Sequence, residues 1–371
     1  MKRVLILHIS EVGGHSKAAE NIKEAINFLS SDIEVITLNS FGYFYPNTEK
    51  IVDFLYTNTI KYLPFLWGVL YDKKPLVKNT SFFLKYINIL TFKKLSLLIK
   101  KFSFNCVIAT QAYPCRLVCD FKKLKGINIP VVAVITDYYP HRFWVHPYVD
   151  KYVVASEEAK DVLIKEGIQK DKIEIFGIPL SIKFINSFPK ENIKEEFGFS
   201  LDLPTILIMG GGLGLGPIER IVLELNKLER DFQIIVICGK NKNLFNWLKK
   251  YANKFRKKIF YFGYVDFVNK IMDFADIIIT KAGGITISEA LAKGLAIIVT
   301  FPIPGQEERN VDFLLKRNAI LRIDNLSKIP FYVDNLLSNR KNLDSLKQSA
   351  KKIAFADSSL RIANLVLKTL I

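Results

Sequence analysis

Glycine, histidine and carboxylate residues recur in this sequence directly after short apolar runs. The first run ends shortly before Gly13, Gly14 and His15, and a helical pattern begins at Ser16. A glycine pair there lets the chain turn tightly and lets a ligand approach the amino end of the helix. His15 is then a candidate general base, because imidazole titrates near neutral pH. A helix-capping surface histidine is the alternative.

A second group follows the apolar run 131–136. Asp137 ends that run, and the next residues include His141, Trp144 and His146. Ligands of open α/β sheets bind beyond the carboxyl ends of the strands, where Asp137 is expected to project. The histidines are otherwise incidental surface residues or metal ligands, although the sequence lacks a compact His/Cys ligand cluster.

A glycine-rich loop interrupts the second half of the chain between an apolar run and a helical pattern that begins near Pro217. Its glycines are Gly210, Gly211, Gly212, Gly214 and Gly216. Backbone amides of such a loop suit a phosphate, helped by the dipole of the following helix. No Lys-Ser or Lys-Thr pair follows, so this is not a Walker A loop. A role in turning alone is the alternative.

The segment KAGGITISEALAKG places a second glycine pair, Gly283 and Gly284, at the start of a helix. Thr286 lies in the first turn of this helix and Glu289 lies one turn further. A hydroxyl and amides at a helix start suit a diphosphate, and the carboxylate suits paired ribose hydroxyls.

The segment FPIPGQEERN then offers three polar side chains that suit sugar hydroxyls: Gln306, Glu307 and Asn310. Each could instead cap a helix. This segment and the two glycine motifs follow successive strands of one domain, so caps alone are a poor explanation for the whole set.

Apolar runs alternate with helical patterns from end to end, which predicts parallel sheets covered by helices. The expected strands are 4–9, 33–38, 106–110, 131–136 and 152–155, then 205–209, 233–238, 259–262, 277–280 and 296–300. Two Rossmann-like domains are therefore predicted, with the boundary between 180 and 204, where periodicity is lost. We assign 1–180 to the first domain and 181–371 to the second.

The formal net charge is +17 over 371 residues, and part of it is concentrated. Residues 41–104 hold 10 Lys+Arg and 3 Asp+Glu, a net +7, together with sixteen aromatic residues. This combination suits docking on an anionic bilayer, and helical periodicity over 82–102 predicts an amphipathic helix there. Nucleic acid attracts the same charge, and ordinary solvated lysines are the plain alternative.

Other sequence features indicate the cellular compartment in which the protein is expected. The apolar run 4–7 is too short for a secretory signal, and no window reaches about 18 apolar residues, so membrane contact is expected to be peripheral. Four cysteines in mostly apolar surroundings suggest unpaired thiols in a reduced cytoplasm.

Taken in order, these motifs resemble a known family. GGGLGLGP, FGYVD, KAGGITISEA and PGQEERN resemble the donor domain of glycosyltransferase family 28, whose members include MurG and the diacylglycerol glycosyltransferases. GGHSKAA and ITDYYPHRFW are similar to the lipid-glycosylating branch. Ser181 departs from the pattern, because the family often has a phosphate-contacting arginine there, and Ile285 replaces a glycine.

The resemblance implies a GT-B fold, α/β with two parallel sheets facing a central cleft. It implies an inverting transfer of a hexose from a UDP-sugar to a membrane lipid such as diacylglycerol, at the inner face of the cell membrane. No cofactor, metal or nucleic acid is expected, and the chain lacks the Asp-x-Asp motif of metal-dependent GT-A enzymes.

The resemblance also implies roles for the residues above. His15 is the favoured base, with Asp137 orienting it or sharing the role, and Gly14, His141 and Trp144 belong to the acceptor side. Amides of 212–214 and 284–286 are expected to hold the diphosphate, and Glu289 the ribose. Gln306 and Glu307 are expected to read the sugar, and uracil to lie near Gly263 and Tyr264.

Three other functions stay open at this point. A MurG-like transferase would add N-acetylglucosamine to a lipid-linked peptidoglycan precursor, but its pattern lacks the Asp-x-x-x-His-x-x-Trp segment. A UDP-sugar 2-epimerase shares the fold and has little use for residues 41–104. A non-catalytic UDP-sugar-binding subunit is disfavoured by His15, Asp137 and Glu289 occurring together.

Overall fold

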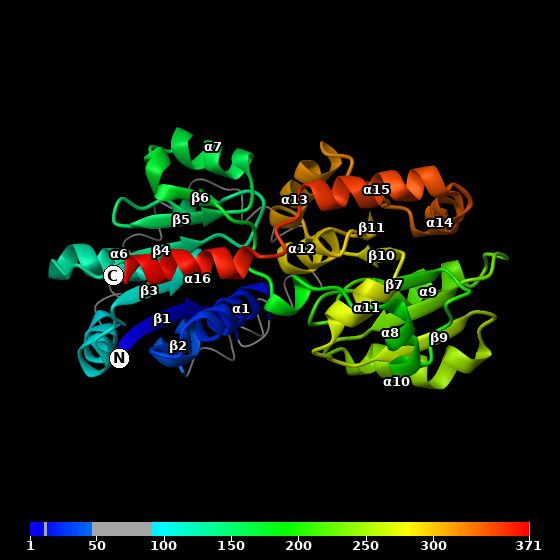
Figure 1. Cartoon of the computed structure of the whole chain (residues 1–371), viewed down its shortest axis with the longest axis horizontal. Helices are drawn as coiled ribbons and strands as arrows, with labels where there is room; N and C mark the ends of the chain where they lie inside the picture. Colours follow the sequence, from blue (N-terminus) through cyan, green and yellow to red (C-terminus); the bar gives the residue numbers. More distant parts are fainter. Residues whose placement is uncertain (11–12, 47–90, 371) are drawn as a thin grey trace. The chain divides into compact units, whose positions relative to one another are not determined.

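The computed structural model describes residues 1–10, 13–46 and 91–370, which form two compact units (Figure 1). Unit 1 comprises Met1–Ile182, Pro304–Gln306 and Asp357–Ile371, and unit 2 comprises Lys183–Ile303 and Glu307–Ala356. Each unit contains one six-stranded sheet in which all strands are parallel. The predicted α/β class with two parallel sheets is therefore confirmed.

The division differs from the predicted ranges at the end of the chain. Helix α16 (Ser358–Thr369) belongs to unit 1, where Ile362, Ala363 and Val366 join the apolar core. The amide of Leu180 also donates to Ser358 Oγ at 3.0 Å. Burial of this apolar helix face on the first sheet explains why the last residues leave the second unit.

The sheet of unit 1 has the strand order β2-β1-β3-β4-β5-β6. Its strands are β1 (Lys2–His8), β2 (Ile33–Asn39), β3 (Cys106–Ala109), β4 (Val131–Val134), β5 (Lys151–Val154) and β6 (Ile173–Ile175). Side chains alternate between the two faces along each strand, as the pleat requires. Both faces are buried, which explains the continuous apolar runs in the sequence.

Helices cover both faces of this sheet. On one face α1 (Gly14–Leu29) and α16 pack on Val4 and Ile6, and on the other α6 (Ala112–Lys125) and α7 (Glu157–Lys165) pack with Leu5 and Leu7. Residues 91–102 form a helix that joins the second of these cores. A short helix, α2 (Ser40–Phe44), follows β2.

The sheet of unit 2 has the order β12-β11-β10-β7-β8-β9, the Rossmann arrangement. Its strands are β7 (Thr205–Met209), β8 (Gln233–Ile237), β9 (Lys258–Phe262), β10 (Ile277–Thr280), β11 (Ala296–Val299) and β12 (Ile320–Arg322). Its helices are α8 (Lys190–Phe197), α9 (Ile218–Leu225), α10 (Lys242–Tyr251), α11 (Val268–Phe274), α12 (Gly284–Ala292), α13 (Gln306–Leu315), α14 (Ile329–Ser338) and α15 (Arg340–Lys352).

Each sheet has a switch point, where the strand order reverses direction along the sheet. In unit 1 it lies between the neighbours β1 and β3, and in unit 2 between β7 and β10. In open α/β sheets the crossover connections of these neighbours lie on opposite sides, and ligands bind beyond the carboxyl ends of the strands there. The glycine and histidine motifs follow these strands.

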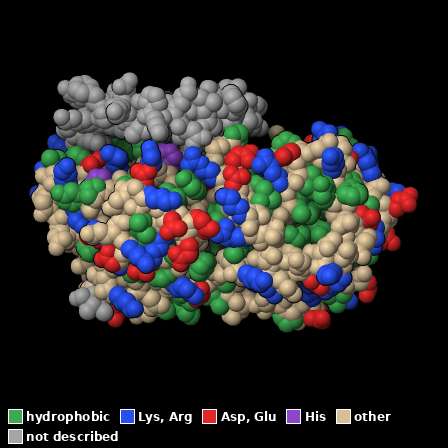
Figure 2. Space-filling model, turned by 90° about the horizontal axis from the view of Figure 1, so that it is seen from above, with side chains coloured by type: hydrophobic (Ala, Val, Ile, Leu, Met, Phe, Trp, Pro, Cys, Tyr) green, Lys and Arg blue, Asp and Glu red, His purple; other side chains and the backbone are tan. Residues whose placement is uncertain are grey.

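The basic, aromatic segment 41–104 lies partly outside the described residues, as do Lys73, Lys74 and the first half of the predicted helix 82–102. Within the described part, Phe44 and Phe104 are buried in the core, and Tyr43 is exposed. On the face drawn in Figure 2, Lys and Arg side chains are spread among Asp and Glu side chains. Among the described residues, no helix combines the length and apolarity needed to cross a membrane.

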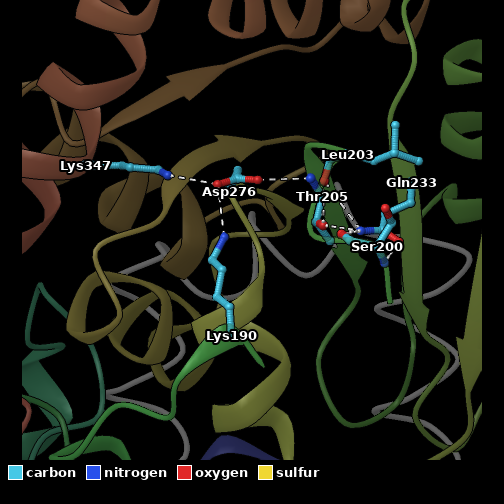
Figure 3. A network of polar contacts seen from close by, with 7 residues as sticks. All are labelled: Lys190, Ser200, Leu203, Thr205, Gln233, Asp276 and Lys347. Atoms are coloured by element: carbon cyan, nitrogen blue, oxygen red, sulfur yellow. Dashed lines mark hydrogen bonds and ion pairs between the residues drawn. The ribbon is translucent and has the colours of Figure 1, made fainter. Parts of the chain in front are cut away.

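Asp276 ties together three elements of unit 2 (Figure 3). It accepts a hydrogen bond from the amide of Thr205 at 3.0 Å, and its other oxygen lies 3.4 Å from the ammonium groups of Lys190 and Lys347. Burial opposes ionisation, but the two lysines and the amide outweigh it and hold the Asp276 pKa below its ordinary value. The carboxylate thus joins α8 and α15 to the start of β7.

We expect Asp276→Ala to lower the free energy of unfolding of unit 2 by about 1.5–3 kcal/mol, the usual loss for charge-assisted hydrogen bonds. Because the folded pKa is depressed, this contribution is present above about pH 4 and is lost as pH falls through the folded pKa. Urea unfolding of both proteins at pH 7 and in acid measures it. The control is Asp344→Ala, which removes an exposed pair with Arg340 worth at most about 0.5 kcal/mol. Equal losses in the two variants would contradict the role of Asp276.

Candidate functional site

His15 lies in the first turn of α1, at the switch point of unit 1. Its Nδ1 is 2.9 Å from the carbonyl oxygen of Thr110, the residue that follows β3, and 2.9 Å from the hydroxyl of Thr136, which follows β4. The hydroxyl of Thr110 donates in turn to the carbonyl of His15 at 2.9 Å. Segments after three neighbouring strands therefore fix this imidazole.

These contacts decide which ring nitrogen carries the proton. A carbonyl oxygen can only accept, so the bond to Thr110 requires Nδ1–H, and the Thr136 hydroxyl oxygen can then only accept from the same N–H. In this neutral tautomer Nε2 carries no proton. Burial is the main cause that lowers the His15 pKa from 6.5 to about 4, opposed by the Thr110 bond and assisted by His8. At neutral pH His15 is thus an uncharged imidazole whose Nε2 can accept a proton.

The other predicted residues of unit 1 differ in how far they are buried. Asp137 is buried and directly follows Thr136, at the carboxyl end of β4. Gly14 is exposed at the start of α1, and His141 is half-buried, with Nδ1 accepting from the amide of Phe143 at 3.2 Å. Trp144 is only 4 % exposed and packs in the apolar core of unit 1.

His146 and the cysteines belong to the framework. The Nε2 atom of His146 lies 3.2 Å from Asp120 Oδ1, and the Nδ1 atom of His146 accepts a hydrogen bond from the amide of Tyr148 at 3.2 Å. All four cysteines are buried, unpaired thiols, as expected from their apolar surroundings. Ser181, which stands where the resemblance predicts an arginine, donates to Glu24 Oε2 at 2.7 Å.

In unit 2 the glycine loop after β7 is folded tightly onto the loop after β8. A Cβ on Gly214 would lie 2.0 Å from the carbonyl oxygen of Cys238, so only glycine fits there. The amide of Gly214 donates to the carbonyl of Gly211 at 2.9 Å, so it is engaged and not available to a phosphate. The amides of Gly211, Gly212 and Leu213 donate to no backbone carbonyl within the described part of the chain. Of the predicted amides 212–214, those of Gly212 and Leu213 therefore remain as candidates and that of Gly214 does not, while the amide of Gly211 is an additional candidate.

Helix α12 begins beside this loop. A Cβ on Gly211 would lie 4.0 Å from Thr286 Oγ1, which places the first turn of α12 against the glycine loop. Its N-cap, Gly283, makes no side-chain capping bond, so the first amides of the helix are available to an anion. Glu289 is buried one turn into the helix. Gly283, Gly284, Thr286 and the loop thus meet at the switch point of unit 2.

A lysine completes this region. Lys281 directly follows β10 and forms an ion pair with Glu307 Oε1, and both side chains are largely buried. Glu307 Oε2 also accepts from the amide of Ile303 at 2.9 Å. A Cβ on Gly283 would lie 3.0 Å from the Lys281 ammonium, and one on Gly211 would lie 3.6 Å from its Cε. The cation therefore sits between the two glycine segments.

The remaining predicted donor residues differ in exposure. Gln306 is half-buried at the start of α13, whereas Asn310 is fully buried and donates to the carbonyl of Ala282 at 3.0 Å. Asn310 thus positions the loop after β10, and the expected direct contact with sugar hydroxyls does not suit its burial. Gly263 follows β9, and Tyr264 is exposed with the Lys240 ammonium 5.9 Å from its ring centroid.

Three residues of these sites, Thr110, Thr136 and Lys281, were not predicted from the sequence. Thr110 and Thr136 end apolar runs, and Lys281 follows one, so their signal was their place directly after a strand. Nothing in the sequence indicated that both threonines would meet His15, because that contact depends on strand order.

The chain matches known families over most of its length. Residues 15–180 match the family described as "Monogalactosyldiacylglycerol (MGDG) synthase", and residues 205–362 match "Glycosyltransferase family 28 C-terminal domain". A relative from Bacillus licheniformis named "Processive diacylglycerol beta-glucosyltransferase" is 30% identical over 96% of this chain and 92% of its own length.

Solved structures agree on the fold. MurG of Acinetobacter baumannii has a TM-score of 0.66 at 18% identity, covering 99% of this chain and 100% of its own. HepE of Anabaena, solved in complex with UDP-glucose, has a TM-score of 0.57 at 10% identity, with complete coverage of both chains. The fold is therefore that of the GT-B enzymes. Together with the matched sequences, it shows that the chain belongs to glycosyltransferase family 28, in the lipid-glycosylating branch of the diacylglycerol glycosyltransferases.

Proposed function

We propose that this glycosyltransferase moves a hexose from a UDP-sugar to a hydroxyl of a membrane lipid such as diacylglycerol. The observation that carries the proposal is the pair of switch-point sites, a neutral imidazole in unit 1 and, in unit 2, a glycine loop and a lysine beside the start of α12. The names of the relatives supply the acceptor class. The MurG-like alternative is not favoured, because residues 15–180 match the monogalactosyldiacylglycerol synthase family.

The donor is held by unit 2 in this proposal. Amides of Gly211, Gly212 and Leu213 and of the first turn of α12 bind the diphosphate, and the helix dipole adds to their positive potential. The carboxylate of Glu289 binds the ribose hydroxyls. Gln306 and Glu307 contact the sugar, and uracil lies against the backbone near Gly263 and Tyr264.

The acceptor is activated by unit 1. His15 Nε2 takes the proton of the lipid hydroxyl while its oxygen attacks the anomeric carbon, and the bond from that carbon to the diphosphate breaks with its electron pair on UDP. Attack opposite the leaving group inverts the anomeric configuration. Asp137, buried after β4, orients this region, and Gly14 and His141 border the acceptor.

We further propose that the reaction needs no metal ion, because amides and the helix dipole supply the positive potential. The enzyme acts at the inner face of the cell membrane, with residues 41–104 attracting the anionic surface, and nucleic acid is not a partner. The described lysines of that segment include Lys93, which is exposed, and Lys94, whose ammonium donates to the carbonyl of Phe44 at 2.9 Å.

The proposed function predicts glycolipid formation in a defined mixture. Purified enzyme, vesicles that contain both diacylglycerol and a lipid-linked peptidoglycan precursor, and radiolabelled UDP-glucose, UDP-galactose or UDP-N-acetylglucosamine are incubated with excess EDTA, and the lipids are separated. We expect a labelled glycolipid with a hexose donor. Label that enters only a lipid-linked peptidoglycan precursor, or no lipid at all, would refute the acceptor class. Activity that appears only after Mg²⁺ or Mn²⁺ is added would refute the metal-free mechanism alone.

His15→Ala is expected to lower turnover by at least about a hundredfold, the usual loss of a general base. UDP affinity should stay unchanged, because the residues proposed to contact UDP itself lie in unit 2. Since protonation of Nε2 removes the base and the pKa is about 4, the wild-type rate should fall in acid near pH 4 and not near 6.5. Rate measurements across pH and calorimetry with UDP check both points. Wild-type turnover in His15→Ala would remove His15 from the mechanism.

Electrostatic docking predicts that Lys73→Gln, Lys74→Gln and Lys93→Gln together weaken binding to anionic vesicles. The effect should diminish at high salt, because ions screen exposed charges. Activity on bilayer acceptor should fall more than activity on acceptor dispersed in detergent. The control carries an equal charge change in exposed lysines elsewhere: Lys242→Gln, Lys249→Gln and Lys352→Gln. Equal flotation of the two triple variants would contradict docking through residues 41–104.

A further inference from the structure

The ion pair of Lys281 and Glu307 occupies the region that the proposed function assigns to the donor diphosphate. Lys281 lies between Gly211 of the loop after β7 and Gly283 at the start of α12, as the contacts of built Cβ atoms show. The side chain of Lys281 is 18 % exposed and that of Glu307 is 8 % exposed. The Glu307 carboxylate therefore pairs with a cation that lies beside the two backbone segments proposed to bind the diphosphate.

Glu307 does not depend on Lys281 for its place. Its second oxygen accepts from the amide of Ile303 at 2.9 Å, and Glu307 lies in the first turn of α13, where the helix dipole favours an anion. The lysine side chain, in contrast, is a flexible stem with a compact charge that can change partner. The pair can thus open by movement of Lys281 while Glu307 keeps its position.

A diphosphate carries more negative charge than one carboxylate, so it competes for the ammonium when it binds between the same glycines. Because Gly211 and Gly283 have no side chains, the Lys281 ammonium has room to move from Glu307 to the diphosphate. At Gly283 an added Cβ would lie 3.0 Å from the ammonium itself, so any larger residue would restrict it.

We propose that Lys281 is the leaving-group cation of this enzyme, which exchanges Glu307 for the β-phosphate when the donor binds and so frees the Glu307 carboxylate for the sugar hydroxyls. The proposal rests on the proposed function. As the bond from the anomeric carbon to the β-phosphate oxygen breaks, its electron pair stays on UDP, and the protonated ammonium stabilises that charge without transferring a proton. Glu307 accepts hydrogen bonds from the sugar only in the donor-bound state.

The test compares UDP with UMP, which lacks the β-phosphate, by titration calorimetry. Lys281→Met should weaken UDP binding about tenfold or more, the scale of a charge-assisted contact, and change UMP affinity by less than about twofold. Lys281→Gln, which still hydrogen-bonds to Glu307, should do the same and serves if the Met variant does not fold. Glu307→Gln should preserve or strengthen UDP binding, because nothing then competes for the ammonium, while kcat/KM with the UDP-sugar falls.

The matched control is Lys293→Met, which breaks another buried pair of unit 2, with Asp273 at 2.9 Å, at the opposite end of α12. It should lower the melting temperature and leave the ratio of UDP to UMP affinity unchanged. If Lys281→Met weakens UDP and UMP equally, or if Glu307→Gln weakens UDP as much as Lys281→Met does, the proposal is wrong. If wild-type enzyme does not bind UDP, the proposed function itself fails. If the wild type and Lys281→Met bind UDP equally, only the role of Lys281 fails.

Discussion

Parallel pairing of all strands is the constraint on which both sites depend. Because every strand of a sheet runs the same way, all carboxyl ends emerge at one edge, and loops distant in sequence meet there. In unit 1 this edge joins His15 to Thr110 and Thr136, about a hundred residues further along the chain. In unit 2 it joins Gly211, Lys281 and Thr286. Asp276 lies at the other edge of the second sheet, where its contacts serve stability.

The central side chain is uncharged at one site and charged at the other. Burial lowers the His15 pKa and outweighs the opposing effect of the Thr110 bond, so the imidazole is neutral and its Nε2 is a proton acceptor throughout the physiological range. Lys281 forms an ion pair with the Glu307 carboxylate, which also accepts a hydrogen bond from a backbone amide. A neutral base for the acceptor and a positive charge near the leaving group are what a single displacement requires. Because a single displacement forms no covalent bond between the sugar and the protein, no nucleophilic side chain is required.

Much of the architecture could be predicted from the sequence because buried parallel strands are continuous apolar runs. All ten predicted strands occur, while β6 and β12 were missed because each has only three residues at a sheet edge. The packing of α16 on unit 1 was missed because an amphipathic pattern does not identify its partner. The glycine motifs lie in the loops after β7 and β10, at the switch point of unit 2. The engaged amide of Gly214, the burial of Asn310 and the pairing of Lys281 depend on tertiary contacts that no local pattern encodes.

The account rests on direct, base-assisted displacement of UDP from the anomeric carbon by a lipid hydroxyl. Its most direct test is the anomeric configuration of the first glycolipid product, determined by proton NMR after reaction with an α-linked UDP-hexose. The account predicts a β-linked product, identified by the large coupling between axial protons at carbons 1 and 2. An α-linked product would show that the configuration is retained, and it would contradict a single displacement with His15 as the base.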